Sequence, residues 1–223
     1  MKAFIIFRDR VHYAHLCLTA MTEAGLDPVI VDMGSTWPLA LDYLKAMDVA
    51  GVQVLHHGGG HPRSLWEWEP FRQACGDDRY VVTDCDVVPT DGCLPDWPEK
   101  LSALLDRYPE FDKAGMGLRL DRIPDDYLRR DHVLKWEQQF WQDPVDATTY
   151  RAAVDTTLAV YRPLTERPAF TMNAVRSGYP YVADHLAWYE DYSELDEELR
   201  YYHEHAEPGI SYWTVAGRSA WGI

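Results

Sequence analysis

Short apolar runs alternate with longer segments of mixed polarity over the first ninety residues of the chain. The runs cover residues 3–7, 28–32, 52–55 and 80–83, and the intervening segments indicate helices over about 11–24, 38–46 and 64–75. Uninterrupted apolar strands are typical of a parallel sheet that is buried on both faces. This alternation predicts a right-handed, Rossmann-like α/β half in residues 1–90, with a mostly parallel sheet flanked by helices.

The pattern loosens after residue 91. Strands are expected at 113–120 and 154–161, and helices at 99–107, at 125–142 and from a capping box of Ser193 and Asp196 to about residue 206. Gly115 and Gly117 mark places where another group approaches the first of these strands closely. The aromatic segments 179–189 and 209–223 have no clear period. No linker or change of composition divides the chain, so we expect one domain over residues 1–223 with a mixed second half.

The composition disfavours some classes of function. With 36 acidic and 21 basic residues, the formal net charge is −15, which is unfavourable for binding the phosphate backbone of a nucleic acid over a broad surface. No apolar run approaches the roughly 20 residues of a membrane span, and the N-terminal run is short and followed by charges, as in a first strand rather than a signal peptide. The four cysteines form no C-x-x-C pair, so we expect a reducing, cytoplasmic setting.

Charged residues follow three of the four predicted parallel strands. They are Arg8 with Asp9, Asp32, and the pair Asp84 and Asp86. The carboxyl ends of parallel strands meet at one edge of a sheet, where ligands bind in open α/β folds. Because alternate residues of a strand face the same side, we expect Asp84 and Asp86 side by side, with Cys85 facing the other way. Two such carboxylates suit Mg²⁺ or Mn²⁺ with substrate phosphates, although the pair can also cap a strand or begin a turn.

Two motifs in this order resemble those of the GT-A class of glycosyltransferases, most closely the family 2 type. The segment from Asp32 to Thr36 is similar to the Asp-x-Gly-Ser-Thr loop of that class, and Asp84-Cys85-Asp86 is similar to its Asp-x-Asp motif. The resemblance implies a GT-A-like fold in which residues 1–90 bind the nucleotide and residues 91–223 the acceptor. It implies that Asp32 contacts the base, that Asp84 and Asp86 hold a divalent ion and the ribose, and that His185 assists the metal or the diphosphate.

Each of these roles has a plain structural alternative. Asp32 can cap the helix that begins near Pro38 or form a turn, and His185 can be a satisfied histidine among aromatic side chains. Arg8, at the end of the first strand, either faces the nucleotide or is solvated. The histidine- and glycine-rich segment 56–61 matches no zinc pattern and is interpreted as a loop near the nucleotide.

A carboxylate is expected as the general base that activates the acceptor hydroxyl. Asp155 falls where the resemblance implies such a residue, and an aspartate acting in this way gives inversion at the anomeric carbon. Val154 stands where the family commonly has a glutamate, so Asp121, Asp125 and Asp126 remain alternatives.

The sequence thus predicts a glycosyltransferase that moves a sugar from a nucleotide-linked donor, a UDP sugar being the expected one, with Mn²⁺ or Mg²⁺. The acceptor hydroxyl is left open between carbohydrate, lipid-linked and other acceptors. One alternative is a nucleotidyltransferase that acts on a sugar phosphate, but the loop after the first strand, Arg8-Asp9-Arg10, lacks the glycines of that class. The other is a non-catalytic carbohydrate-binding protein, which the 13% of aromatic residues would suit.

Overall fold

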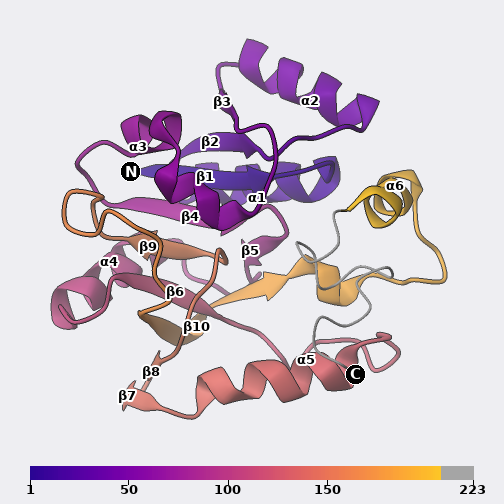
Figure 1. Cartoon of the computed structure of the whole chain (residues 1–223). Coiled ribbons are helices and arrows are strands. Elements are labelled where there is room, and N and C mark those ends of the chain that lie inside the picture. Colours follow the sequence, from indigo (N-terminus) through magenta and orange to yellow (C-terminus); the bar gives the residue numbers. More distant parts are fainter. Residues whose placement is uncertain (207–223) are drawn as a thin grey trace.

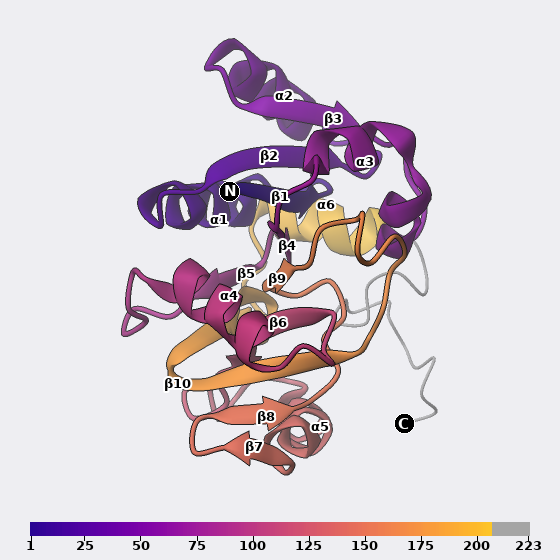
Figure 2. The same cartoon turned by 90° about the vertical axis from the view of Figure 1, so that its left-hand side faces the viewer.

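The computed structural model describes residues 1–206, so the aromatic segment 209–223 lies outside the described residues. Ten strands form one sheet in the order β3-β2-β1-β4-β9-β6-β10-β8-β7, with β5 paired to β10 off this path (Figures 1 and 2). The N-terminal half consists of β1 (Lys2–Phe7), α1 (Val11–Glu23), β2 (Asp27–Asp32), α2 (Pro38–Val49), β3 (Gln53–His56), η1 (Pro62–Glu67), α3 (Glu69–Cys75) and β4 (Tyr80–Asp84).

The four strands of this half are parallel, as predicted. β1 lies between β2 and β4, in a register that pairs Phe7 with Asp32 and Ile6 with Asp84, and β3 pairs with the far side of β2. The charged residues after β1, β2 and β4 therefore do meet at one edge of the sheet. Asp9 supports the start of α2 there, because its carboxylate accepts the N–H groups of Thr36 at 2.7 Å and of the next residue at 2.8 Å.

Alternate side chains of the parallel strands enter two separate cores. Ile5 and Phe7 face the side covered by α1, α2 and a later helix, α4 (Trp97–Arg107). Phe4 and Ile6 face the side covered by η1 and α3. The sequence predicted one helix over η1 and α3, but the helix is interrupted at Trp68 because Pro70 in the first turn of α3 has no N–H to continue a hydrogen-bonded helix.

The C-terminal half is mixed, as expected. Its strands are β5 (Val87–Pro89), β6 (Lys113–Leu118), β7 (Pro144–Asp146), β8 (Thr149–Arg151), β9 (Ala159–Tyr161) and β10 (Ala174–His185). Its other elements are α4, α5 (Arg130–Glu137), η2 (Gln138–Trp141), η3 (Leu186–Tyr189) and α6 (Glu197–His205). β9 runs antiparallel to both of its neighbours, β4 and β6, and so joins the two halves of the sheet, while β6 and β10 are parallel (Figure 2).

Three expectations for this half need correction. The strand predicted at 154–161 forms only over β9, because residues 154–158 are drawn into a loop beside the sheet edge. The helix predicted at 125–142 is confined to α5 and η2. The cap of α6 is Asp196, whose carboxylate accepts the N–H of Leu199 at 2.8 Å, while the hydroxyl of Ser193 donates instead to Asp191.

The two glycines of β6 do mark close approaches. A Cβ at Gly115 would lie 2.7 Å from a methyl group of Val154, and a Cβ at Gly117 would lie 2.7 Å from the carbonyl oxygen of Ser177 and from the ring of Trp141. Both distances are shorter than carbon can tolerate, so the packing of β10 and of the loop after β8 against β6 requires glycine at these positions. None of the helices within residues 1–206 has the length and apolar character needed to span a bilayer.

Candidate active site

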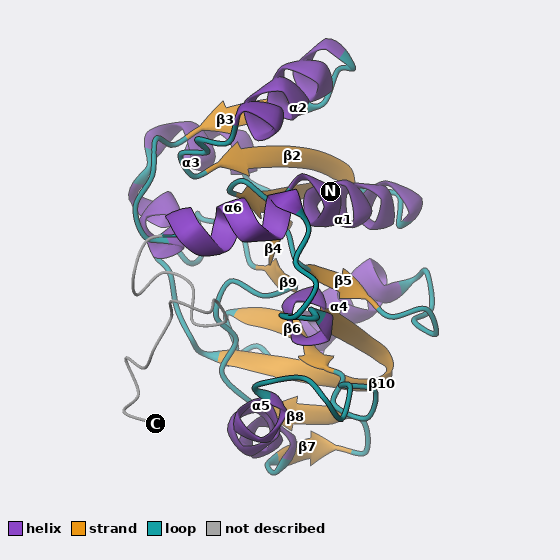
Figure 3. Cartoon of the chain, turned by 90° about the vertical axis from the view of Figure 1, so that its right-hand side faces the viewer, coloured by secondary structure: helices purple, strands orange, loops and turns teal. Residues whose placement is uncertain are grey.

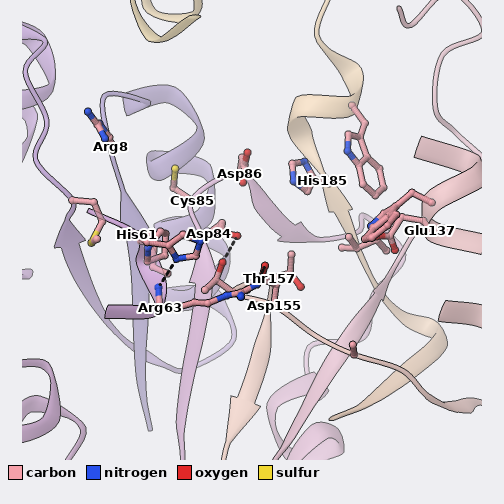
Figure 4. Close-up of a pocket in the computed structure, with 18 of the residues that line it drawn as sticks. Arg8, His61, Arg63, Asp84, Cys85, Asp86, Glu137, Asp155, Thr157 and His185 are labelled. Carbon is pink, nitrogen blue, oxygen red and sulfur yellow. Dashed lines mark hydrogen bonds and ion pairs between the residues drawn. The ribbon is translucent and has the colours of Figure 1, made fainter. Parts of the chain in front are cut away.

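A pocket of about 440 Å³ opens where the carboxyl ends of β1 and β4 meet the second half of the sheet. Figure 4 shows side chains from both halves of the chain on its walls. Five of the six residues proposed from the sequence line it: Arg8, Asp84, Asp86, Asp155 and His185. The sixth, Asp32, does not line the pocket, although the next residue in the chain does.

The two aspartates of the Asp-x-Asp motif do not lie on one strand face, contrary to the prediction. β4 ends at Asp84, and Cys85 and Asp86 form a turn into β5. The chain turns here because β5 pairs antiparallel with β10, in a register that places Val87 opposite His185. A turn and a distant strand, rather than the pleat of one strand, therefore bring Asp84, Asp86 and His185 to one pocket.

Asp84 sits in an anionic setting deep in the pocket wall. Burial, and then the charges of Asp86 and Asp155, raise the pKa of its carboxyl to about 8. One of its oxygens accepts a hydrogen bond from the Thr156 hydroxyl at 2.9 Å, which favours the ionised form and offsets part of the rise. Since a nearby cation would relieve both the burial penalty and the repulsion, this carboxyl has the electrostatics expected of a cation ligand.

Asp86 is instead paired with Arg10, a residue that the sequence reasoning did not propose. The buried Arg10 guanidinium donates to Oδ2 of Asp86 at 2.7 Å and also to the carboxylate of Glu190, and it lies between two tyrosine rings. The centroids of the Tyr13 and Tyr202 rings are 4.4 and 4.6 Å from it. No local signal distinguishes Arg10 from a solvated arginine, because Glu190 and Tyr202 come from the far end of the chain.

α6 closes this side of the site and crosses in front of the N-terminal strands (Figure 3). Glu198 caps α1, since both of its carboxylate oxygens lie 3.1 Å from the N–H of His12. His203 contacts the second oxygen of Glu190 at 3.1 Å. These contacts hold α6, and with it Tyr202, against the pocket.

Asp155 is tied to Arg63 rather than presented alone. Arg63 donates to both carboxylate oxygens, at 3.2 and 2.9 Å, and each of the two side chains is 45% exposed (Figure 4). Behind this pair, the buried Lys113 ammonium donates to the main-chain carbonyl of Asp155 at 2.8 Å. Burial lowers the pKa of Lys113 to about 7, and the charge of Asp155 opposes that shift. A base role for Asp155 stays a prediction, and it requires the Arg63 pair to open.

Asp32 makes a turn of its own. One of its carboxylate oxygens accepts the N–H of Ser35 at 2.9 Å, and the other lies 3.2 Å from Nδ1 of His56. This is the turn-forming arrangement, and the proposed contact with the nucleobase stays a prediction. The following loop lies beside the pocket: Gly58, Gly59 and Gly60 all have positive φ, and His61 lines the pocket.

The alternative acids predicted as bases lie away from the pocket walls. Asp121 accepts a hydrogen bond from the hydroxyl of Tyr179, and Asp125 and Asp126 are exposed. α5 contributes Glu137 instead, a buried carboxylate that the sequence did not single out. It pairs with Arg176 at 2.9 Å, so it is charge-compensated within the wall.

The residues present fit an incomplete divalent-cation site. Within residues 1–206, no three His, Cys, Asp or Glu side chains are close enough to hold a metal ion among themselves. Mg²⁺ and Mn²⁺, however, take one or two carboxylates and complete their shell with water and phosphate oxygens. Asp84, whose charge is poorly compensated, and the second oxygen of Asp86 match that donor set. Four arginines line the walls, Arg8, Arg10, Arg63 and Arg176, and the last three pair with carboxylates of this chain, so an anionic ligand would share them with those carboxylates.

The order of elements is that of a GT-A-like fold, and known structures share it. TarS from S. aureus aligns with a TM-score of 0.53 and 10% identity over 95% of this chain and 41% of TarS. A TarS fragment, 1–349, aligns with a TM-score of 0.50 and 11% identity over 83% of this chain and 60% of the fragment. A weaker similarity joins the chain to glucosyl-3-phosphoglycerate synthase from Mycobacterium tuberculosis in complex with Mn²⁺ and UDP-glucose. The TM-score is 0.42 at 15% identity, over 72% of this chain and 55% of the synthase.

No family model and no curated protein sequence matches the chain. The chain spans about 60% of the TarS fragment and less than half of the longer TarS structure. At these identities the similarity shows the fold alone, and it confirms the GT-A-like architecture expected from the sequence.

Proposed function

We propose that this protein is a glycosyltransferase that moves a sugar from a nucleotide-linked donor, a UDP sugar by preference, to an acceptor hydroxyl, with Mn²⁺ or Mg²⁺. The observation that carries the proposal is the Asp84–Asp86 turn at the carboxyl edge of a parallel sheet, inside an arginine-lined pocket. It combines two carboxylates for a cation with positive side chains for phosphates. The GT-A-like fold supports it, because fold and site point to the same substrate class.

In this proposal residues 1–90 bind the nucleotide and residues from 91 onward the acceptor, within one domain. Asp84 and one oxygen of Asp86 would hold the ion beside the diphosphate, and His185, on the same pocket wall, would assist the diphosphate. When bound, a divalent ion supplies positive charge that stabilises the leaving diphosphate. Arg8 and Arg63, on the pocket wall, would contact the phosphate oxygens, and the nucleobase would lie towards the Asp32 turn.

Asp155 is proposed as the general base that takes the proton of the acceptor hydroxyl, so that the acceptor oxygen attacks with inversion. Its carboxylate is bonded to Arg63 in this structure, and a phosphate group entering the pocket competes for that arginine. The role therefore depends on donor binding before proton transfer. We propose a reducing compartment for the protein, because Cys17, Cys75, Cys85 and Cys93 are all free thiols.

A thermal-shift experiment tests the proposal directly. UDP with Mn²⁺ should raise the melting temperature, while UDP with EDTA and Mn²⁺ with adenosine should raise it much less. A panel of nucleotide sugars, followed by release of nucleoside diphosphate, then identifies the donor. A nucleotidyltransferase would release pyrophosphate from a nucleoside triphosphate and a sugar phosphate, and a carbohydrate-binding protein would respond to free sugars alone. If no nucleoside diphosphate gives a metal-dependent rise in melting temperature, the proposal is rejected.

A further inference from the structure

Arg10 joins the Asp-x-Asp turn to the far end of the described chain. Arg10 is 4% exposed, and its guanidinium bridges two carboxylates, that of Asp86 in the turn and that of Glu190 after η3. Glu190 also accepts from the Tyr13 hydroxyl at 3.3 Å and contacts His203 at 3.1 Å. Arginine suits this position because its rigid planar fork can serve two carboxylates at fixed angles.

The bridge limits what Asp86 can offer to a ligand. Oδ2 of Asp86 already accepts from Arg10, so Oδ1 is the better donor of the two to a ligand in the pocket. Oδ2 of Asp84 is likewise engaged, by the Thr156 hydroxyl. The turn therefore presents one oxygen from each aspartate, in orientations set by Arg10 and Thr156.

The charge of Arg10 also bears on cation binding. With both aspartates ionised, the pair carries two negative charges, and Arg10, in direct contact with Asp86, offsets part of them in a buried setting where screening is weak, although Glu190 shares the charge of Arg10. A divalent cation would thus meet a weaker negative potential than two unpaired aspartates would provide. A nucleoside diphosphate brings further negative charge, so the cation and the nucleotide would each strengthen binding of the other.

We propose that Arg10 is a positioning residue of the cation–diphosphate site. It orients Asp86 so that one oxygen faces the pocket, and its charge keeps the affinity for a free divalent cation low until the diphosphate is present. This inference rests on the proposed function.

The test measures Mn²⁺ binding from the electron paramagnetic resonance signal of the free ion, with and without UDP. The main variant is the double substitution Arg10→Gln with Glu190→Gln, which removes one charge of each sign and leaves no buried Glu190 carboxylate unpaired. Mn²⁺ alone should bind this variant at least tenfold more tightly than it binds the wild type, and UDP should enhance Mn²⁺ binding severalfold less. The single variant Glu190→Gln keeps the Arg10–Asp86 pair but removes the anion that shares the charge of Arg10, so it should bind Mn²⁺ alone more weakly than the wild type does. Near-UV circular dichroism checks that each variant is folded.

Arg10→Lys separates orientation from charge and also serves if the double variant does not fold. Lysine keeps the positive charge but lacks the rigid planar fork that fixes the two carboxylates relative to each other. Mn²⁺ alone should bind as weakly as in the wild type, whereas Mn²⁺ with UDP should bind several times more weakly. The role of Arg10 would be overturned if the folded double variant bound Mn²⁺, alone and with UDP, with the same affinities as the wild type. If the double variant does not fold, the same result for the lysine variant would overturn it. Failure of the wild type to bind Mn²⁺ with UDP would instead reject the proposed function, and the comparison of variants in Mn²⁺ alone would still decide the effect of the Arg10 charge.

Discussion

Replacing the two aspartates of the Asp84-Cys85-Asp86 motif by asparagine, one at a time, should shift stability in opposite directions. Asp84 is an acid whose ionised form is disfavoured by burial and by neighbouring carboxylates. Asp86 is the partner of a buried arginine. Asn at position 84 removes a repelled charge, whereas Asn at position 86 leaves Arg10 with one carboxylate instead of two. Without metal, we therefore expect Asp84→Asn to stabilise the protein and Asp86→Asn to destabilise it.

The magnitudes follow from the pKa of Asp84 and from the Arg10 pair. The rise from 3.8 to about 8 means that the folded state binds more protons than the unfolded state in this range, so stability falls as pH rises from 4 to 8. At about 1.4 kcal/mol per pKa unit the full shift is an upper bound of about 6 kcal/mol, and we expect about 2–3 kcal/mol after relaxation of the site. Asp86→Asn should cost about 2 kcal/mol, because Glu190 still pairs with Arg10.

Urea unfolding in EDTA at pH 4.5 and pH 8 measures both effects. The advantage of Asp84→Asn should be largest at pH 8 and much smaller at pH 4.5, where Asp84 is protonated in the folded state and the pH lies less than one unit above its unfolded-state pKa of 3.8. In the presence of Mn²⁺ and UDP at pH 8, the wild type should instead be more stable than Asp84→Asn, because only the wild type then gains binding energy. An Asp84→Asn variant that is less stable than the wild type at pH 8 in EDTA would refute the electrostatic reasoning.

Three further outcomes are expected. Gly117→Ala should destabilise the protein by about 1–3 kcal/mol in the same urea titration, since the added Cβ would lie 2.7 Å from the β10 backbone. Gly92→Ala is the control and should be neutral, because nothing lies within 4 Å of a Cβ at that position. Arg63→Gln should raise the KM for the donor, because the proposed contact of Arg63 with the phosphate oxygens is lost; an unchanged donor KM would contradict this role. Lys113→Met should gain stability relative to the wild type as pH falls from 10 to 7. Burial lowers the pKa of Lys113 to about 7, so the lysine opposes folding most at pH 7, where it is fully protonated in the unfolded chain. A pH-independent difference in urea midpoints would count against this prediction.

The parallel half of the fold could be predicted from the sequence because its signals are local. Its strands centre on short apolar runs, and glycine or proline stands near the ends of the helices between them, as Gly25 and Pro38 do. The edge that carries Asp84 follows from that pattern, since parallel strands end together.

What the sequence could not show depends on partners far along the chain. The break after Asp84 exists because β5 pairs with β10, and a local pattern of apolar residues on both sides of the aspartates gives no sign of it. Asp155 stands before two threonines in the sequence, but its partner Arg63 lies 92 residues away. Arg10 follows another charged residue and would be taken as solvated, although α6 and Glu190 bury it.

The three-residue strand β9 has a consequence for how the molecule can be divided. It comes from the second half of the chain, yet it covers the edge of β4, where Tyr80, Val81 and Val82 pair with it. A fragment limited to residues 1–90 would expose this apolar edge, and unpaired apolar edges recruit strands from other molecules. Pairing of β4 with β9 must also wait for contacts between distant parts of the chain, which slows folding. We therefore expect that the proposed nucleotide-binding half does not fold alone, and that a chimera that exchanges it must exchange β9 with it.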